Sequence, residues 1–88
     1  MADFTLEQLQ EYTRHTTVER LRKRYPNGTR VVLLQMDDPQ APPVGTKGTV
    51  YGVDDIANVL VCWDNGSRLN VAYGADRIGK VLSGFDEE

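Results

Sequence analysis

The sequence predicts a mainly β domain, a small five-stranded barrel preceded by a helical segment. Three observations predict it: short runs in which apolar residues occur with a period of two, turn residues clustered between those runs, and a length of 88 residues, which suits one small domain. Hydrophobic residues at 40% and charged residues at 26% are ordinary values for a folded protein and argue against disorder.

The stretch 59–68, VLVCWDNGSR, gives the clearest strand signal. Apolar residues occupy both faces of 59–63, and Trp63 falls in register with two valines. The Asp-Asn-Gly sequence at 64–66 tolerates positive φ, so we expect 67–73 to return as an antiparallel strand. This stretch therefore predicts a tight hairpin.

Three further strands are expected at 29–36, 47–53 and 76–82, the last of them as a strand or a helical turn. A loop with three prolines at 37–45 and a turn at 54–58 separate these elements. Five short strands at close spacing indicate a closed barrel rather than an open sheet. The residues expected in its core are Val32 or Leu33, Leu34, Val50, Val59, Val61, Trp63, Leu69 and Val71.

The amino-terminal segment carries helix signals. Thr5 and Gln8 have the spacing of a capping box, and Thr16 with Glu19 repeats that spacing. The threonine-rich run at 13–17 has poor helix propensity. We therefore expect two short helices or one kinked helix rather than a long straight one. The domain boundaries that follow are 1–27 for the helical extension, 28–83 for the barrel and 84–88 for an acidic tail.

Charge and cysteine content limit the function. The net charge is −3, with an excess of basic residues before residue 31 and an excess of acidic residues after it, so the barrel would repel a nucleic-acid backbone. Cys62 is the only cysteine, which excludes an internal disulfide and a cysteine-based zinc cluster, and we expect its thiol to be buried and inert. No cofactor or metal is indicated. The chain shows no membrane span and no leader pattern, which predicts a cytoplasmic protein.

A family resemblance covers about two thirds of the chain, from Gly28 to roughly Lys80. The pattern GTRVVLLQMDDP…PPVGTKGTVYGVDD…VLVCWDNGSRLN resembles a family of small, functionally uncharacterised domains encoded by bacteria and mobile genetic elements, phages among them. More distantly, the order glycine-x-valine at 48–50 and valine-x-tryptophan-aspartate-asparagine-glycine at 61–66 is similar to the mind-bomb/Herc-type domain. That resemblance implies an SH3-like barrel that captures peptides. The helical segment lies outside both resemblances.

The expected contact surface for a protein partner combines aromatic, charged and amide side chains. If Val50 points inward, its neighbour Tyr51 points outward, and an exposed tyrosine near an arginine is typical of interfaces. The stiff loop at 37–44 adds to this surface, or else only shapes the crossing between strands. The side chains predicted to contact a protein are Asp37, Asp38, Tyr51, Asp54, Asp55, Arg68, Asn70 and Tyr73.

Two charged groups have competing interpretations. The loop aspartates can mimic phosphates and occupy the groove of a nuclease or defence complex, but aspartates also stabilise turns through their own backbone, and their spacing matches no calcium loop. The basic run Arg20, Arg22, Lys23 and Arg24 can contact nucleic-acid phosphates, or can be a solvated helix face paired with nearby carboxylates.

No catalytic constellation is present in the sequence. His15 has no second histidine and no partner pattern for acid–base chemistry, and no nucleophile elbow or phosphate-binding loop occurs. The function expected from the sequence is a non-catalytic protein-interaction module of a bacterium or mobile genetic element, one version of which inhibits a host nuclease or defence complex through the acidic barrel. Nucleic-acid binding through the basic run is the alternative. The helical extension is expected to cover a barrel edge, to mediate self-association or to supply a second contact.

Overall fold

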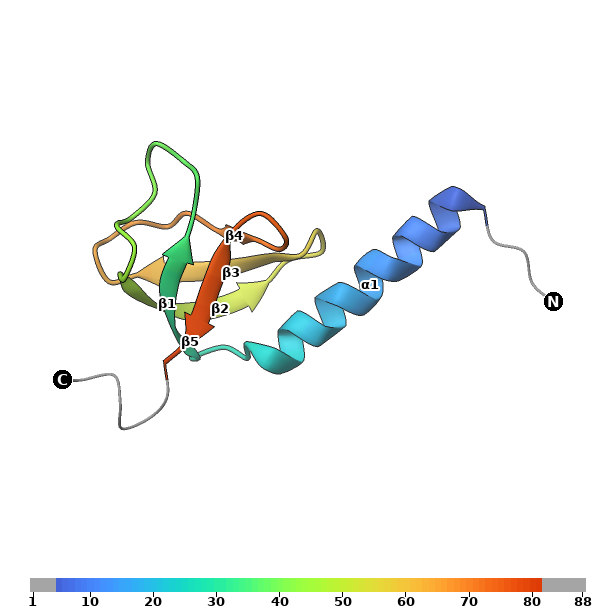
Figure 1. The fold of residues 1–88 in the computed structure, drawn as a ribbon. Helices are drawn as coiled ribbons and strands as arrows, with labels where there is room; N and C mark the ends of the chain where they lie inside the picture. Colours follow the sequence, from blue (N-terminus) through green and yellow to red (C-terminus); the bar gives the residue numbers. More distant parts are fainter. Residues whose placement is uncertain (1–4, 82–88) are drawn as a thin grey trace.

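The computed structural model describes residues 5–81 (Figure 1). One helix, α1 (Leu6–Arg24), precedes five strands: β1 (Arg30–Gln35), β2 (Lys47–Val53), β3 (Asn58–Trp63), β4 (Val71–Ala72) and β5 (Arg77–Lys80). The strands form one antiparallel sheet in the order β4-β3-β2-β1-β5. The predicted class, mainly β with an amino-terminal helix and five strands, is confirmed. The predicted acidic tail at 84–88 lies outside the described residues.

The helix α1 is continuous, so the expected break near the threonines is absent. Its amino terminus is the predicted capping box: the Gln8 amide donates to Thr5 Oγ1 (3.1 Å), and the Thr5 amide donates to Gln8 Oε1 (2.9 Å). Within the helix, the Thr17 hydroxyl donates to the Thr13 carbonyl (2.9 Å), which gives this polar side chain a partner inside the helix. The weak propensity of threonine is thus overcome by the cap and by the absence of glycine and proline from 6–24.

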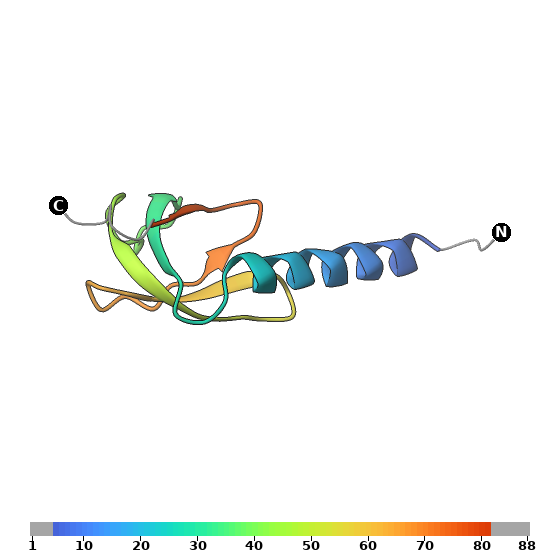
Figure 2. The same ribbon diagram turned by 90° about the horizontal axis from the view of Figure 1, so that it is seen from below.

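Among the described side chains of α1 and its C-cap, those buried against the sheet lie at the carboxyl-terminal end. Val18, Leu21 and Tyr25 are buried, at spacings of three and four residues that place them on one side of the helix. The amino-terminal half projects beyond the sheet in both views, and Leu6 and Leu9 are exposed there (Figures 1 and 2). The contact between α1 and the sheet is therefore one short apolar patch.

A β-bulge in β2 sets which residues of that strand face the core. The pairing with β3 shifts between Val50 and Gly52, which leaves Tyr51 as the extra residue. Val50 and Val53 are three positions apart and would face opposite sides of a regular strand, yet both are buried. The bulge restores Val53 to the inner face, where it lies under α1, and Tyr51 remains on the outside, as predicted.

The sheet is curved but not closed, so the expected closed barrel is not confirmed. Its two edge strands are β4 and β5, and the short connection 73–76 joins them. Within this connection the Asp76 amide donates to the Ala72 carbonyl (2.9 Å), and an isolated bridge links Tyr73 with Asp76. The two edges thus approach at this connection, and no described ladder joins them along their length.

The strand predicted at 67–73 is shorter than expected. The turn after β3 is tight, with the Gly66 amide donating to the Trp63 carbonyl and Gly66 at positive φ, but pairing with β3 resumes only at Val71. The indole Nε1–H of Trp63 donates to the Leu69 carbonyl (2.9 Å). This hydrogen bond holds the chain between the turn and β4 in place, although that segment forms no strand pairing. A side chain, rather than a strand partner, therefore satisfies this backbone oxygen.

The core lies between the inner face of the sheet and the end of α1. Its buried residues are Val18, Leu21, Tyr25, Val31, Leu33, Val50, Val53, Ala57, Val59, Val61, Trp63 and Val71. Trp63 is 2% exposed, which confirms its predicted core position. Leu34 was predicted in the core and is 51% exposed, because it alternates with Leu33 and points to the other face of β1. Leu69 and Cys62 are half-buried rather than buried.

Candidate functional site

A cleft of about 630 Å³ lies where the sheet is open, between the end of α1 and the connection from β4 to β5. We call it the α1–β5 cleft. The side chains of Leu21 and Tyr25 contribute from the helix side, and Val59 and Val71 from the sheet. The remaining lining residues are Arg24, Gln35, Tyr73, Gly74, Ala75, Asp76, Arg77 and Ile78. The cleft therefore combines an apolar floor with charged groups at its margin.

Arg24 is held at one side of the cleft by the tyrosine that follows it. Its Nε donates to the hydroxyl oxygen of Tyr25 (3.2 Å), and its guanidinium carbon lies 5.5 Å from the centre of that ring. Tyr25 is itself buried (7% exposed), so it is a fixed support for the arginine. The guanidinium thus keeps its two terminal nitrogens for a ligand while Nε is used internally.

Arg77 lies at the β5 side of the cleft, next to Asp76 in the chain. The Asp76 carboxylate is engaged by the turn, because its Oδ2 accepts a hydrogen bond from the Ala72 amide (2.8 Å). Asp76 therefore stabilises the β4–β5 connection, and its single carboxylate at the cleft is outnumbered by two arginines, Arg24 from α1 and Arg77 from β5. An anionic group suits this margin.

Tyr73 links the cleft to a second, shallower groove. It is 60% exposed, lines the α1–β5 cleft and also lines an almost entirely apolar groove against the projecting half of α1. Leu9, Thr13 and Thr17 form the helical side of this groove, and Ala57 lies at its base. Two predicted contact residues therefore lie at concave surfaces: Tyr73 at the cleft and at this groove, and Asp55 at a separate hollow beside His15 and Arg22 on α1.

The other predicted contact residues lie elsewhere. Tyr51 is 46% exposed on the bulge of β2, and Arg68 and Asn70 are exposed in the segment between β3 and β4. None of these three lines the α1–β5 cleft. The structure therefore does not gather the predicted aromatic and charged side chains into one surface.

The four predicted aspartates separate into two groups at opposite ends of β2. Asp37 and Asp38 lie in the loop before this strand, and Asp54 and Asp55 lie in the turn after it (Figure 1). Asp38 closes its own turn by accepting a hydrogen bond from the Gln40 amide (2.8 Å). A single acidic surface made from all four is therefore absent from the described part of the chain.

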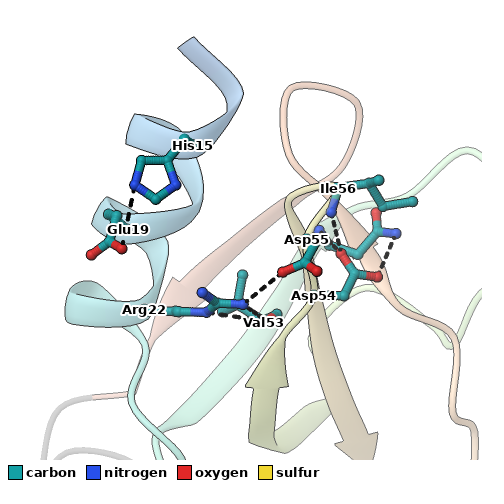
Figure 3. A network of polar contacts seen from close by, with 8 residues as sticks. His15, Glu19, Arg22, Val53, Asp54, Asp55 and Ile56 are labelled. Atoms are coloured by element: carbon teal, nitrogen blue, oxygen red, sulfur yellow. Dashed lines mark hydrogen bonds and ion pairs between the residues drawn. The ribbon is translucent and has the colours of Figure 1, made fainter. Parts of the chain in front are cut away.

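Asp54 is a structural turn residue. Its Oδ1 accepts hydrogen bonds from the Ile56 and Asn58 amides (3.1 and 2.8 Å), and its Oδ2 accepts one from the Asn58 side chain (3.1 Å) (Figure 3). Partial burial acts to raise the pKa of Asp54, but these hydrogen bonds and the nearby Arg22 charge outweigh it and hold the pKa below its ordinary value. Asp54 therefore fits the competing interpretation, in which the aspartate stabilises its own turn.

The basic run on α1 is partly engaged within the molecule. Arg22 donates to the Val53 carbonyl from Nε (3.3 Å) and Nη2 (3.0 Å), and Nη2 also contacts Asp55 Oδ1 (3.2 Å) (Figure 3). Arg24 lies on Tyr25 at the cleft, while Arg20 and Lys23 are exposed. Arg22 therefore ties the helix to the turn after β2, and the four basic residues do not form one uniform surface.

The side chains able to hold a metal ion are dispersed in residues 5–81. No cluster of three histidine, cysteine, aspartate or glutamate side chains able to hold a metal ion occurs there. His15 is exposed, and its Nε2 lies 3.8 Å from Glu19 Oε2, one helical turn away (Figure 3).

Among the described helical residues, none forms a segment both long and apolar enough to cross a membrane.

Sequence reasoning missed Tyr25, Arg77 and Ile78 at the cleft. A signal for Tyr25 was available, since Val18, Leu21 and Tyr25 have the spacing of one helical face. No comparable signal existed for Arg77 or Ile78, because the cleft forms only where the sheet fails to close.

Fold and cleft together define a small, mainly β domain with an amino-terminal helix and a cleft beside the open edge of its sheet. The chain matches the family described as Domain of unknown function (DUF4314) over residues 14–81, and it belongs to that family. The match begins inside α1, so the packed half of the helix is part of the family pattern, beyond the Gly28 boundary expected from the sequence. No curated protein and no solved structure matches the chain.

Proposed function

We propose that this protein is a non-catalytic protein-interaction module whose α1–β5 cleft receives a segment of its partner. The observation that carries the proposal is the cleft itself, about 630 Å³ with an apolar floor and arginines at its margin. Binding sites are typically concave, mainly apolar and supplied with a few convergent polar groups. The exposed ring of Tyr73 adds the kind of aromatic side chain that interfaces favour.

The side chains at the cleft support binding rather than catalysis. Its charged and polar members are Arg24, Tyr25, Gln35, Tyr73, Asp76 and Arg77. Asp76 is engaged by the Ala72 amide, and no histidine, cysteine or serine is present among the lining residues to act as a nucleophile with a base. The distant resemblance to a peptide-capturing domain supports the same class of function.

The partner we favour is a protein of the host in which a bacterial or mobile-element gene is expressed, as the sequence resemblance suggests. The more specific hypothesis, in which the acidic loops imitate a nucleic acid and occupy the groove of a nuclease, requires a continuous acidic surface. Asp37 and Asp38 lie at the opposite end of β2 from Asp54 and Asp55, and Asp54 serves its own turn. We therefore assign the contact to the cleft, and expect charge reversal at Asp37 and Asp55, the two that do not close a turn, to leave partner binding intact.

Two tyrosines of similar exposure allow a matched test. Tyr73→Ala alters the cleft, whereas Tyr51→Ala makes the same change on the outer face of β2. Each variant is used as bait in a lysate of the native host, with and without nuclease, and the captured proteins are quantified by mass spectrometry. We expect a nuclease-resistant partner that Tyr73→Ala loses and Tyr51→Ala keeps. Loss with Tyr51→Ala alone would move the interface to the outer face.

Nucleic-acid binding by the basic run is the alternative function. The exposed side chains of Arg20 and Lys23 support it, while the engagement of Arg22 by Val53 and Asp55 counts against it. It predicts an affinity that falls steeply with added salt and with alanine at the basic positions. A gel shift with single- and double-stranded probes at low salt tests it, and the absence of any shift excludes it.

A further inference from the structure

The unpaired edge of β5 faces the opening of the sheet. β1 pairs with β5 on one side, and no described strand pairs with it on the other. The Val81 amide donates to the Arg30 carbonyl, so Arg30 and Val81 form a hydrogen-bonded pair. Hydrogen-bonded and non-hydrogen-bonded pairs alternate along an antiparallel ladder, so Val32 and Gly79 form a hydrogen-bonded pair as well. The backbone N–H and C=O groups of Ile78 and Lys80 are therefore directed away from β1, as a template for one more strand.

The α1–β5 cleft provides a place for the side chains of such a strand. Ile78 lies on β5, lines the cleft and packs against the core. A strand added beside β5 sends alternate side chains to the same face of the sheet, so every second residue of a ligand would enter the cleft. Leu21, Tyr25 and Val71 would be their apolar neighbours there.

The charges at the margin of the cleft select the cleft-facing side chains toward the two ends of a bound strand. Arg24 and Arg77 stand on two sides of the cleft, and Lys80 is exposed at the end of β5. The guanidinium of Arg24 is oriented in advance by Tyr25, which lowers the cost of pairing it with a carboxylate. A basic or neutral peptide gains nothing from these three cations.

We propose that the α1–β5 cleft binds an extended segment of a partner protein as a sixth strand on β5, in which the alternate residues that face the cleft are apolar in the middle of the segment and acidic toward its ends. The proposal rests on the proposed function and specifies its ligand. Main-chain hydrogen bonds to Ile78 and Lys80 hold the segment, the apolar floor takes alternate side chains, and carboxylates pair with Arg24 and Arg77. The added strand covers the open edge of the sheet.

The direct test is fluorescence anisotropy at about 0.15 M salt with a labelled short peptide whose alternate residues are glutamate, leucine, phenylalanine and glutamate, each separated from the next by a threonine. The comparison peptide has lysine in place of glutamate. A third peptide keeps the glutamates but is N-methylated at alternate residues, which removes the N–H donors along one edge of the strand. It is made in two versions, one for each edge. We expect binding of the acidic peptide, none of the lysine peptide, and loss with one N-methylated version only.

Protein variants locate the bound peptide. Arg24→Glu and Arg77→Glu are each expected to weaken the acidic peptide by about tenfold or more. Lys23→Glu makes the same charge change on a neighbouring residue of α1 that does not line the cleft, and should leave the affinity unchanged. The double variant R24E/R77E should bind the lysine peptide in preference to the acidic one. Circular dichroism confirms that each variant is folded.

Several results would overturn the proposal: equal binding of acidic and lysine peptides, insensitivity to both N-methylated versions, or an equal effect of Lys23→Glu and Arg24→Glu. Dimer formation through the β5 edge, seen by analytical ultracentrifugation and disrupted by Arg77→Glu, would identify a second copy as the occupant and would overturn it as well. If no peptide binds but Tyr73→Ala still abolishes partner capture, the ligand class is wrong and the proposed function stands.

Discussion

Arg30 on β1 forms a bidentate ion pair with Asp64, the residue after β3. Its Nη1 donates to Asp64 Oδ1 (2.9 Å) and its Nη2 to Oδ2 (2.6 Å), while Nη1 also donates to Thr49 Oγ1 (3.0 Å) on the strand between them. One arginine thereby connects three successive strands of the sheet. The hydrogen bonds from Arg30 hold the pKa of Asp64 below its ordinary value.

This pair makes stability depend on pH in a defined direction. Because the pKa of Asp64 is lower in the folded state, its contribution is complete above the ordinary aspartate value of 3.8 and is lost as the pH falls through the folded pKa. We expect Asp64→Asn to reduce the free energy of unfolding by about 0.5 to 1 kcal/mol at neutral pH, since both partners are partly exposed. Urea unfolding of both proteins tests this, and a difference that grows in acid would contradict it.

Two glycines of β2 provide a matched pair for packing. A Cβ at Gly48 would lie 2.6 Å from Val61 Cγ1 and 2.8 Å from Trp63 Cε3, whereas at Gly52 the nearest atom, Leu60 Cδ1, would be 3.5 Å away. We expect Gly48→Ala to destabilise the fold by about 1 to 3 kcal/mol or more through overpacking, and Gly52→Ala to be nearly neutral. Thermal unfolding measures both, and similar melting temperatures would contradict the close packing of Gly48 against β3.

Trp63 serves the core and its neighbouring loop together. Trp63→Ala should cost about 3 to 5 kcal/mol, because a 2% exposed indole leaves a cavity. Trp63→Phe keeps most of the apolar contact but deprives the Leu69 carbonyl of its donor, and should cost about 1 to 3 kcal/mol. Urea unfolding followed by circular dichroism gives both values. A loss of ligand binding by folded Trp63→Phe with unchanged stability would assign Trp63 to a binding surface instead.

Arg22 holds the packed end of α1 to the turn after β2. Arg22→Ala removes the donors to the Val53 carbonyl and the contact with Asp55, so we expect a loss of about 1 kcal/mol and faster amide exchange in the second half of α1. Lys23→Ala is the control, since Lys23 is an exposed neighbour with the same charge. Hydrogen exchange with mass spectrometry distinguishes the two, and equal exchange would show that Arg22 does not hold the helix.

Much of the fold was predictable because its signals are local. The Thr5–Gln8 capping box, the period of two in 59–63 and the turn at 54–58 are each decided within a few residues, and the structure contains all three. The break expected at 13–17 was wrong, because a capped helix without glycine or proline tolerates threonines whose hydroxyls find carbonyls within it. The placement of Leu34 was wrong because an apolar run such as VVLL does not reveal which face is inside.

The candidate site was less predictable, because the sequence names charged and aromatic residues but not their neighbours. Tyr73 was expected at a contact surface and lies at the cleft, whereas Tyr51 and Arg68 lie away from it. Arg24 was predicted only as a phosphate contact, yet its position on Tyr25 makes it a wall of the cleft.

By itself, the sequence determined the class of this protein, the approximate extent of four of its five strands and the burial of its single tryptophan. Short-range periodicity and turn chemistry suffice for those features. Only the tertiary structure decided that the sheet remains open between β4 and β5, that α1 packs by its final turns, and that Arg24 and Arg77 line the same cleft. These arrangements depend on bulges, register and side-chain packing, which local sequence patterns do not encode.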